Sequence, residues 1–171
     1  TPQQAALLRW YQGNKSAPTF SAGNSPCGVV FDGSNIWISS YGDNTVTKLR
    51  PGDGQVLGTF AVGTSPCRMA YDGSHVWVAN TGGGNVSKVR ASDGVVTATI
   101  PIGQEPSAAV FDGENVWVTS HGDSKVVKIR ASDNAVLGSI PVDAPSGIAF
   151  DGTNVWVGNN VGNGTVTKVA G

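Results

Sequence analysis

The chain has 171 residues, a formal net charge of −1 and only 13% charged residues. This length suits one domain, and the near-neutral charge argues against nucleic acid or anionic membrane as a partner, because both attract basic proteins. No apolar run approaches the roughly 20 residues of a membrane-spanning helix, so no membrane span is expected.

The first 13 residues, TPQQAALLRWYQG, are the one helical signal in the chain. Thr1 suits the N-cap, Pro2 suits the first helical position, and Gln4 completes a capping box. Gly13 suits the position just after a helix. We therefore expect a short α-helix over residues 1–13, which docks on the body because so short a helix is marginal by itself.

One short sequence motif recurs through the remainder of the chain. FDGSNIWIS at 31–39 returns as YDGSHVWVA at 71–79, FDGENVWVT at 111–119 and FDGTNVWVG at 150–158. Recurrence at a nearly constant period of about 40 residues indicates a repeat protein. Each copy carries one tryptophan, and these are Trp37, Trp77, Trp117 and Trp156.

Each repeat predicts four short strands, A to D, which in the first repeat are residues 28–31, 35–39, 45–50 and 55–60. The Asp-Gly pair between A and B is a strong hairpin signal. Strands A and B are apolar at consecutive positions, which is typical of strands buried on both faces. The four tryptophans are therefore expected in the core.

The fourth repeat ends after its third strand, TVTKVA at 165–170, whereas PTFSAG at 18–23 reads like the end of a repeat. We predict that residues 18–23 complete the last sheet and so remove the open ends of the array. The predicted fold is all-β, a closed four-bladed β-propeller over residues 18–171. Its blades cover about 27–62, 67–102, 107–142 and 146–171, the last completed by 18–23.

The repeat, with its FDG turn, NVWV strand, TVTK strand and ASDG turn, resembles the YVTN-type β-propeller repeats of bacterial secreted and surface-layer proteins. The resemblance covers about residues 18–171 and implies a secreted β-propeller with no single activity. Members of that family usually have seven blades. Four repeats therefore imply either a small complete ring or half of an eight-bladed ring formed by two chains.

A more distant resemblance is to virginiamycin B lyase-like propellers. Their metal-assisted chemistry needs clustered His and acidic residues over the central opening. This chain offers only His75 and His121, which we expect on opposite faces. No lyase residue is therefore carried over, and neither a metal nor a cofactor is expected.

In propellers the D–A and B–C loops share the usual binding face, so residues that break the repeat there are the candidate binding residues. Within this set, His121 and Asp123 could act as an acid–base pair. The alternative is that all of these residues are solvated loop positions without a function. The candidates are Tyr41, Asp43, Arg68, Glu105, His121 and Asp123.

Cys27 and Cys67 hold the same position in successive repeats, where the third and fourth repeats carry Ser107 and Ser146. Equivalent positions on neighbouring innermost strands lie close together, so a disulfide is expected in an exported protein. Two buried thiols are the alternative, and zinc is disfavoured because no His lies nearby. The start at Thr1 also suits a secreted or cell-surface protein, with the bacterial periplasm as the alternative.

Few charged groups and near-identical repeats favour a non-catalytic extracellular module for protein interaction or structure. Self-association through the propeller faces or the N-terminal helix is a specific version of this hypothesis. A ligand- or glycan-binding propeller is the first alternative. A lyase or hydrolase that uses the D–A and B–C loop face is the second.

Overall fold

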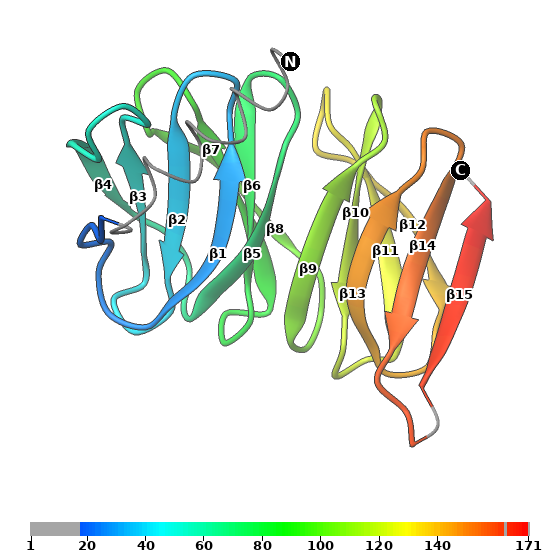
Figure 1. The fold of residues 1–171 in the computed structure, drawn as a ribbon. Coiled ribbons are helices and arrows are strands. Elements are labelled where there is room, and N and C mark those ends of the chain that lie inside the picture. The colour runs from blue at the N-terminus through cyan, green and yellow to red at the C-terminus, as the bar shows by residue number, and fades with distance from the viewer. Residues whose placement is uncertain (1–17, 163, 171) are drawn as a thin grey trace, which may run out of the picture.

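The structure is a computed structural model that describes residues 18–162 and 164–170. This part of the chain forms fifteen strands in four antiparallel sheets and contains no helix (Figure 1). The helix expected over residues 1–13 lies outside the described residues. No described segment is a helix long and apolar enough to cross a membrane. The all-β repeat organisation expected from the 40-residue period is confirmed.

The strands follow the repeats, and within each sheet they pair in chain order. Sheet 1 contains β1 (Pro26–Phe31), β2 (Ile36–Ser40), β3 (Thr45–Leu49) and β4 (Val56–Ala61). Sheet 2 contains β5 (Pro66–Tyr71), β6 (His75–Asn80), β7 (Asn85–Arg90) and β8 (Val96–Pro101). Sheet 3 contains β9 (Pro106–Phe111), β10 (Asn115–Ser120), β11 (Lys125–Arg130) and β12 (Val136–Pro141). Sheet 4 contains only β13 (Pro145–Phe150), β14 (Asn154–Asn159) and β15 (Thr165–Ala170).

The aspartate of each Asp-Gly turn connects the turn to the core. Asp32 accepts hydrogen bonds from the amides of Ser34 and Asn35 and, at 2.7 Å, from the indole Nε1 of Trp37. Burial by itself would raise the pKa of Asp32, but these bonds outweigh it and lower the pKa below its ordinary 3.8. The tryptophans of the other three repeats make the same bond to their own aspartates. The repeated phrase therefore encodes a buried tryptophan together with the acceptor that satisfies its N–H.

Three hydrophobic layers separate the four sheets. Trp37, Trp77 and Trp117 each lie in one of these layers and are at most 2% exposed. A lysine of the third strand lies over each indole ring, as Lys48 does at 5.3 Å from the centre of Trp37. Trp156 is different: 38% of it is exposed, because no sheet covers the outer side of sheet 4. The expectation that all four tryptophans are core residues was therefore wrong for Trp156.

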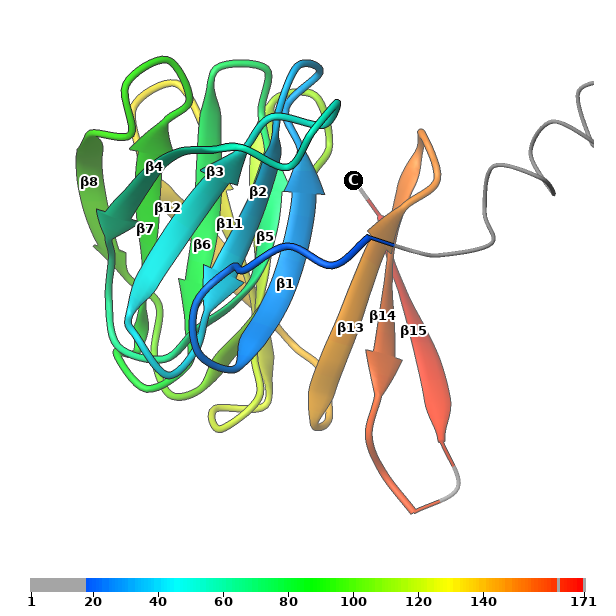
Figure 2. The ribbon, with the colours of Figure 1, turned by 60° about the vertical axis from the view of Figure 1, so that its left-hand side comes forward.

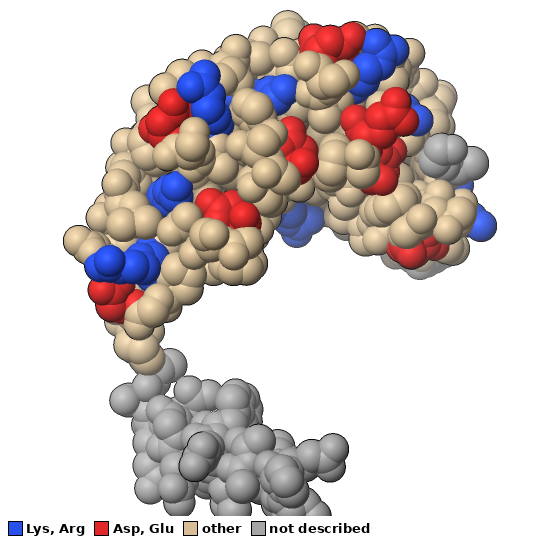
Figure 3. All heavy atoms as spheres, turned by 90° about the horizontal axis from the view of Figure 1, so that it is seen from above, with Lys and Arg blue, Asp and Glu red and all other residues tan. Residues whose placement is uncertain are grey.

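The prediction of a closed four-bladed ring was also wrong. Sheet 4 has three strands, residues 18–23 form no strand, and β15 is a free edge (Figure 2). Viewed from above, the described part of the molecule has the outline of an arc that stays open on one side (Figure 3). The innermost strands contact one another from β1 through β5 and β9 to β13, but β13 makes no comparable contact with β1, so the four sheets do not come round far enough to meet. Residues 18–23 therefore do not complete the sheet at the far end of the arc.

Candidate binding groove on the loop face

The D–A and B–C loops are joined by backbone hydrogen bonds. The Tyr41 amide donates to the Ser25 carbonyl at 3.0 Å, and the Gly42 amide donates to the Asn24 carbonyl at 3.1 Å. The same bonds recur in the next two repeats, and the fourth keeps the first of them. The two loop types therefore form one continuous face, as we assumed when we selected the candidate residues. We call it the loop face.

Asp43 and Asp123 hold this face together. The Asp43 carboxylate accepts the Asn24 amide at 2.7 Å, and Asp123 accepts the Gln104 amide at 3.0 Å in the equivalent place. Asp123 also forms an ion pair with Lys125 at 2.9 Å. The hydrogen bond from Lys125 is the main reason that the pKa of Asp123 lies below its ordinary value. Both aspartates thus orient a D–A loop through its backbone.

His121 and Asp123 do not form the acid–base pair that their spacing suggested. The Nδ1 atom of His121 lies 3.2 Å from the Pro145 carbonyl oxygen, on the neighbouring sheet. Asp123 is engaged instead by Lys125 and by the Ser120 hydroxyl. The two side chains therefore serve separate structural contacts, and the described residues contain no cluster of three or more His, Cys, Asp or Glu suited to a metal ion.

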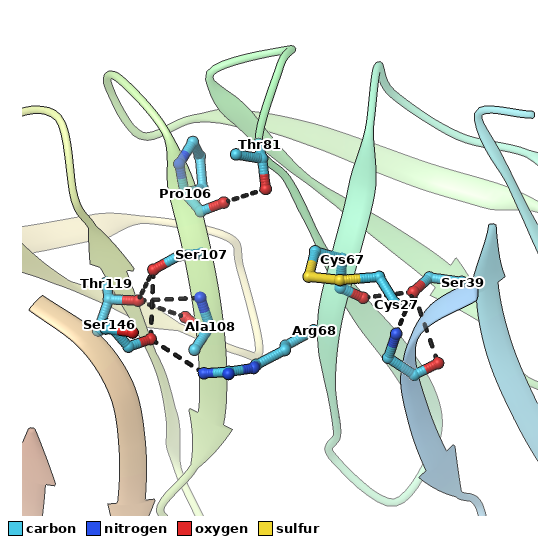
Figure 4. The surroundings of a disulfide bond; sticks show 11 residues. Cys27, Ser39, Cys67, Arg68, Thr81, Pro106, Ser107, Ala108, Thr119 and Ser146 are labelled. Atoms are coloured by element: carbon cyan, nitrogen blue, oxygen red, sulfur yellow. Dashed lines mark hydrogen bonds between the residues drawn. A yellow bond between two sulfur atoms is a disulfide. The ribbon is translucent and has the colours of Figure 1, made fainter. Parts of the chain in front are cut away.

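Arg68 lies on β5, away from the loops. Its Nη1 donates to the Ser146 carbonyl at 3.2 Å, so the side chain reaches past sheet 3 to sheet 4 (Figure 4). It lines a hollow on the inner edge of the arc together with Gly28, Ala108 and Gly147. The structure therefore assigns Arg68 to the inner wall, where its guanidinium links two sheets that are not adjacent.

The disulfide between Cys27 and Cys67 is present and joins β1 to β5, with a Cα–Cα distance of 4.8 Å (Figure 4). Ser39 supports this contact, because its hydroxyl accepts the Gly28 amide and donates to the Cys67 carbonyl. In the equivalent place between sheets 3 and 4, the Ser107 hydroxyl lies 3.3 Å from the Ser146 carbonyl oxygen. A hydrogen bond thus replaces the covalent link in the second half of the chain.

Tyr41 and Glu105 are the two candidates that the fold brings together. They line one groove of about 670 Å³ on the loop face, with Thr81, the run Gly82–Gly84 and Gln104 between them. Tyr41 is 44% exposed at the rim. Sequence reasoning missed Thr81 and the glycine run, although three consecutive glycines in a single B–C loop were a visible signal. The groove is the place where residues peculiar to three different loops meet.

His75 lies at the opposite end of the strands, as expected, in a second hollow with Asp72, Lys88 and Glu114. Burial, and then the nearby charge of Lys88, lower the pKa of His75. Its Nδ1 lies 2.8 Å from the Ser74 hydroxyl, and its amide donates to Asp72 as the Asn35 amide does to Asp32. The backbone of His75 therefore makes the same turn contact as the equivalent residue of the first repeat.

Comparison with known proteins gives the fold. No family model matches the chain, and no curated protein matches it. Among solved structures, hydrazine synthase from Kuenenia stuttgartiensis aligns with 91% of this chain at a TM-score of 0.80 and 21% identity. The computationally designed Ika4 protein aligns with 91% at a TM-score of 0.78 and 14% identity, and the alignment covers 98% of that chain.

A second designed protein, Ika8, aligns with 85% of this chain at a TM-score of 0.73 and 14% identity. The chain spans 49% of the hydrazine synthase chain and 45% of the Ika8 chain. At these identities the similarity concerns the fold alone, so nothing about activity or ligands follows from it.

Proposed function

We propose that this chain is a non-catalytic, secreted or cell-surface module that binds a polypeptide partner in the groove on the loop face. The observation that carries the proposal is the meeting of Tyr41, Glu105 and Gly82–Gly84 in one open groove. The repeat does not dictate these residues. The positions equivalent to Tyr41 hold Thr81, His121 and Asn160, and those equivalent to Glu105 hold Ser25, Ser65 and Ala144.

The chemistry of the groove suits an extended peptide with a basic side chain. Tyr41 offers a rigid contact surface with a polar end, which is the kind of group that dominates binding surfaces. The glycine run brings backbone donors and acceptors within reach of another main chain, since no side chain covers them. Glu105 takes part in none of the ion pairs among the described residues, so its carboxylate can receive a Lys or Arg.

Two further observations support the non-catalytic and extracellular parts of the proposal. The titratable groups beside the groove, His121 and Asp123, are directed to the Pro145 carbonyl and to Lys125. The Cys27–Cys67 disulfide fits an oxidising compartment, because such bonds are rare in reducing cytosol.

A random-peptide display selection on the folded chain tests the proposal. Enriched peptides should carry Lys or Arg, and Tyr41→Ala or Glu105→Gln should weaken their binding by about tenfold or more, which corresponds to about 1.4 kcal/mol. Glu114→Gln is the matched control, because Glu114 lies in the hollow on the opposite face. Peptides that bind the Tyr41→Ala/Glu105→Gln variant as tightly as the unmodified chain would contradict the proposed groove. Glycan-array binding that depends on Tyr41, without any enriched peptide, would instead support the glycan-binding alternative.

A further inference from the structure

The two ends of the arc expose two halves of one hydrophobic layer. In the layer between sheets 1 and 2, Trp37 and Val46 of sheet 1 pack against Met69, Val76, Val78 and Val89 of sheet 2, with Phe60 and Tyr71 beside them. The sheet 2 members have equivalents on the outer side of sheet 1, which are Val29, Phe31, Ile36, Ile38 and Leu49. Trp156 and Val166 in sheet 4 are the equivalents of Trp37 and Val46.

At the sheet 1 end, Leu49 is buried and Ile36 and Ile38 are partly buried, with Phe20 beside them. The remaining equivalents are exposed because no sheet faces them. Val29 is 68% exposed and Phe31 54% exposed at one end, and Val166 is 65% exposed at the other, whereas Val46 is fully buried. Each end therefore has the apolar side chains that the other end would need to form a fourth layer like the three inside the chain. Apolar surface of this kind on a folded protein marks an interaction site.

The fourth strand that sheet 4 lacks can be located by the same comparison of equivalent positions. In sheet 1, β3 pairs with β4 in a register that sets Val46 opposite Phe60 and Thr47 opposite Thr59. The same register on β15 sets Val166 opposite Phe20 and Thr167 opposite Thr19. Phe20 already lies against sheet 1, where its ring occupies the space beside Gly54 that the Phe60 ring occupies beside Gly94. Residues 18–23 thus lie where the last strand of a sheet preceding sheet 1 would run.

A lysine contact repeats in the same way. The Lys48 Nζ donates to the Ala91 carbonyl and the Lys88 Nζ to the Ala131 carbonyl, both at 2.7 Å, so each lysine reaches the next sheet. Lys168 lies 5.6 Å from the centre of the Trp156 ring, at the open end of the arc. By the same spacing, its acceptor is the Pro51 carbonyl of a sheet 1 placed next to sheet 4.

We propose that this neighbour is a second copy of the chain. The β15 strand of one copy pairs with residues 18–23 of the other, Phe20 of the second copy covers Trp156 of the first, and the same contact forms at the other junction. Two identical head-to-tail contacts then close a ring of eight sheets with twofold symmetry. Four sheets of this kind also form part of longer chains, since this chain aligns with 49% of the hydrazine synthase chain and 45% of the Ika8 chain.

Light scattering during size-exclusion chromatography gives the first test. The full chain should elute at twice its mass of 17.5 kDa. Val166→Lys should halve that mass, because a charge at the junction prevents burial. Val136→Lys is the matched control and should leave it unchanged, since Val136 is 50% exposed on β12, away from both junctions. A single-chain mass for the unmodified protein, or a mass above two chains, would overturn the two-copy ring.

Cysteine cross-linking gives a test that does not depend on the stability of the Val166→Lys variant. A Phe20→Cys chain and a Val166→Cys chain, refolded together, should form a disulfide-linked pair of one chain of each kind on non-reducing gels. A Ser74→Cys chain, altered on the opposite face, should form no such pair with Val166→Cys. Absence of the mixed pair would refute the proposal. So would a Phe20→Cys/Val166→Cys chain that cross-links within itself, because that result would mean closure by a single chain.

Discussion

Removal of the disulfide should weaken the fold by an amount that the structure allows us to calculate. The bond joins residues 40 apart in sequence, and in the chain-entropy model closure of a loop of that size destabilises the unfolded state by about 4 kcal/mol. The Cα–Cα distance of 4.8 Å lies within the usual range for disulfides. In a Cys27→Ser/Cys67→Ser variant, a hydrogen bond like that between Ser107 and Ser146 can return about 1 kcal/mol. We therefore expect a net loss of about 3 kcal/mol.

The assay is urea unfolding of both proteins at one fixed protein concentration, which must be held constant because self-association would shift the midpoint. The variant should unfold at a lower urea midpoint and with a somewhat steeper slope, because the unfolded chain without the cross-link exposes more surface. Mild reduction of the unmodified chain should lower the midpoint at least as far, because it opens the same loop without supplying the serine hydrogen bond. A loss below about 1 kcal/mol would refute the loop-entropy reasoning. It would mean that strain of the disulfide in the folded state cancels most of the entropy that the bond removes from the unfolded state.

Three further predictions follow from the turns and loops. Asp112→Asn should lower the free energy of unfolding by about 1–2 kcal/mol, because the Trp117 indole loses a charged acceptor; Asp133→Asn, at an exposed ion pair, should lower it less in the same urea titration. Stability should fall as the pH drops below about 5, because the turn aspartates Asp32, Asp72, Asp112 and Asp151 have folded-state pKa values below their ordinary 3.8, so that the unfolded state binds more protons. Urea titrations between pH 2 and 7 measure how the free energy of unfolding changes with pH, and this change should be smaller in Asp112→Asn. An equal change in the variant and the unmodified chain would contradict the assignment to the turn aspartates. Glu105→Gly should stabilise the chain by about 1 kcal/mol, because Glu105 adopts a φ of +51° that favours glycine, yet abolish selection of basic peptides; loss of stability in thermal unfolding would contradict the first half.

The local features of the repeat could be read before the structure because they depend on neighbours in sequence. The Asp-Gly pairs predict the hairpins, and Cys27 and Cys67 predict their disulfide because equal positions in adjacent repeats lie side by side. The hydrogen bond from each tryptophan N–H to its turn aspartate was not anticipated, although the spacing between the two residues, as from Asp32 to Trp37, is the same in every repeat. Tyr41 and Glu105 were selected as breaks in the repeat, but nothing local indicated that they share a groove.

The sequence by itself determined the all-β repeat, the order of the strands within each sheet and the position of every turn. Only the tertiary structure decided that the arc stays open, that Trp156 is exposed and that Phe20 lies beside Gly54 rather than against β15. The physical reason is that hairpins follow from local backbone preferences and from the apolar run in each strand, whereas the angle between two sheets follows from the volume and shape of side chains that pack across them. That angle accumulates from layer to layer, so a count of repeats does not tell where the ring closes.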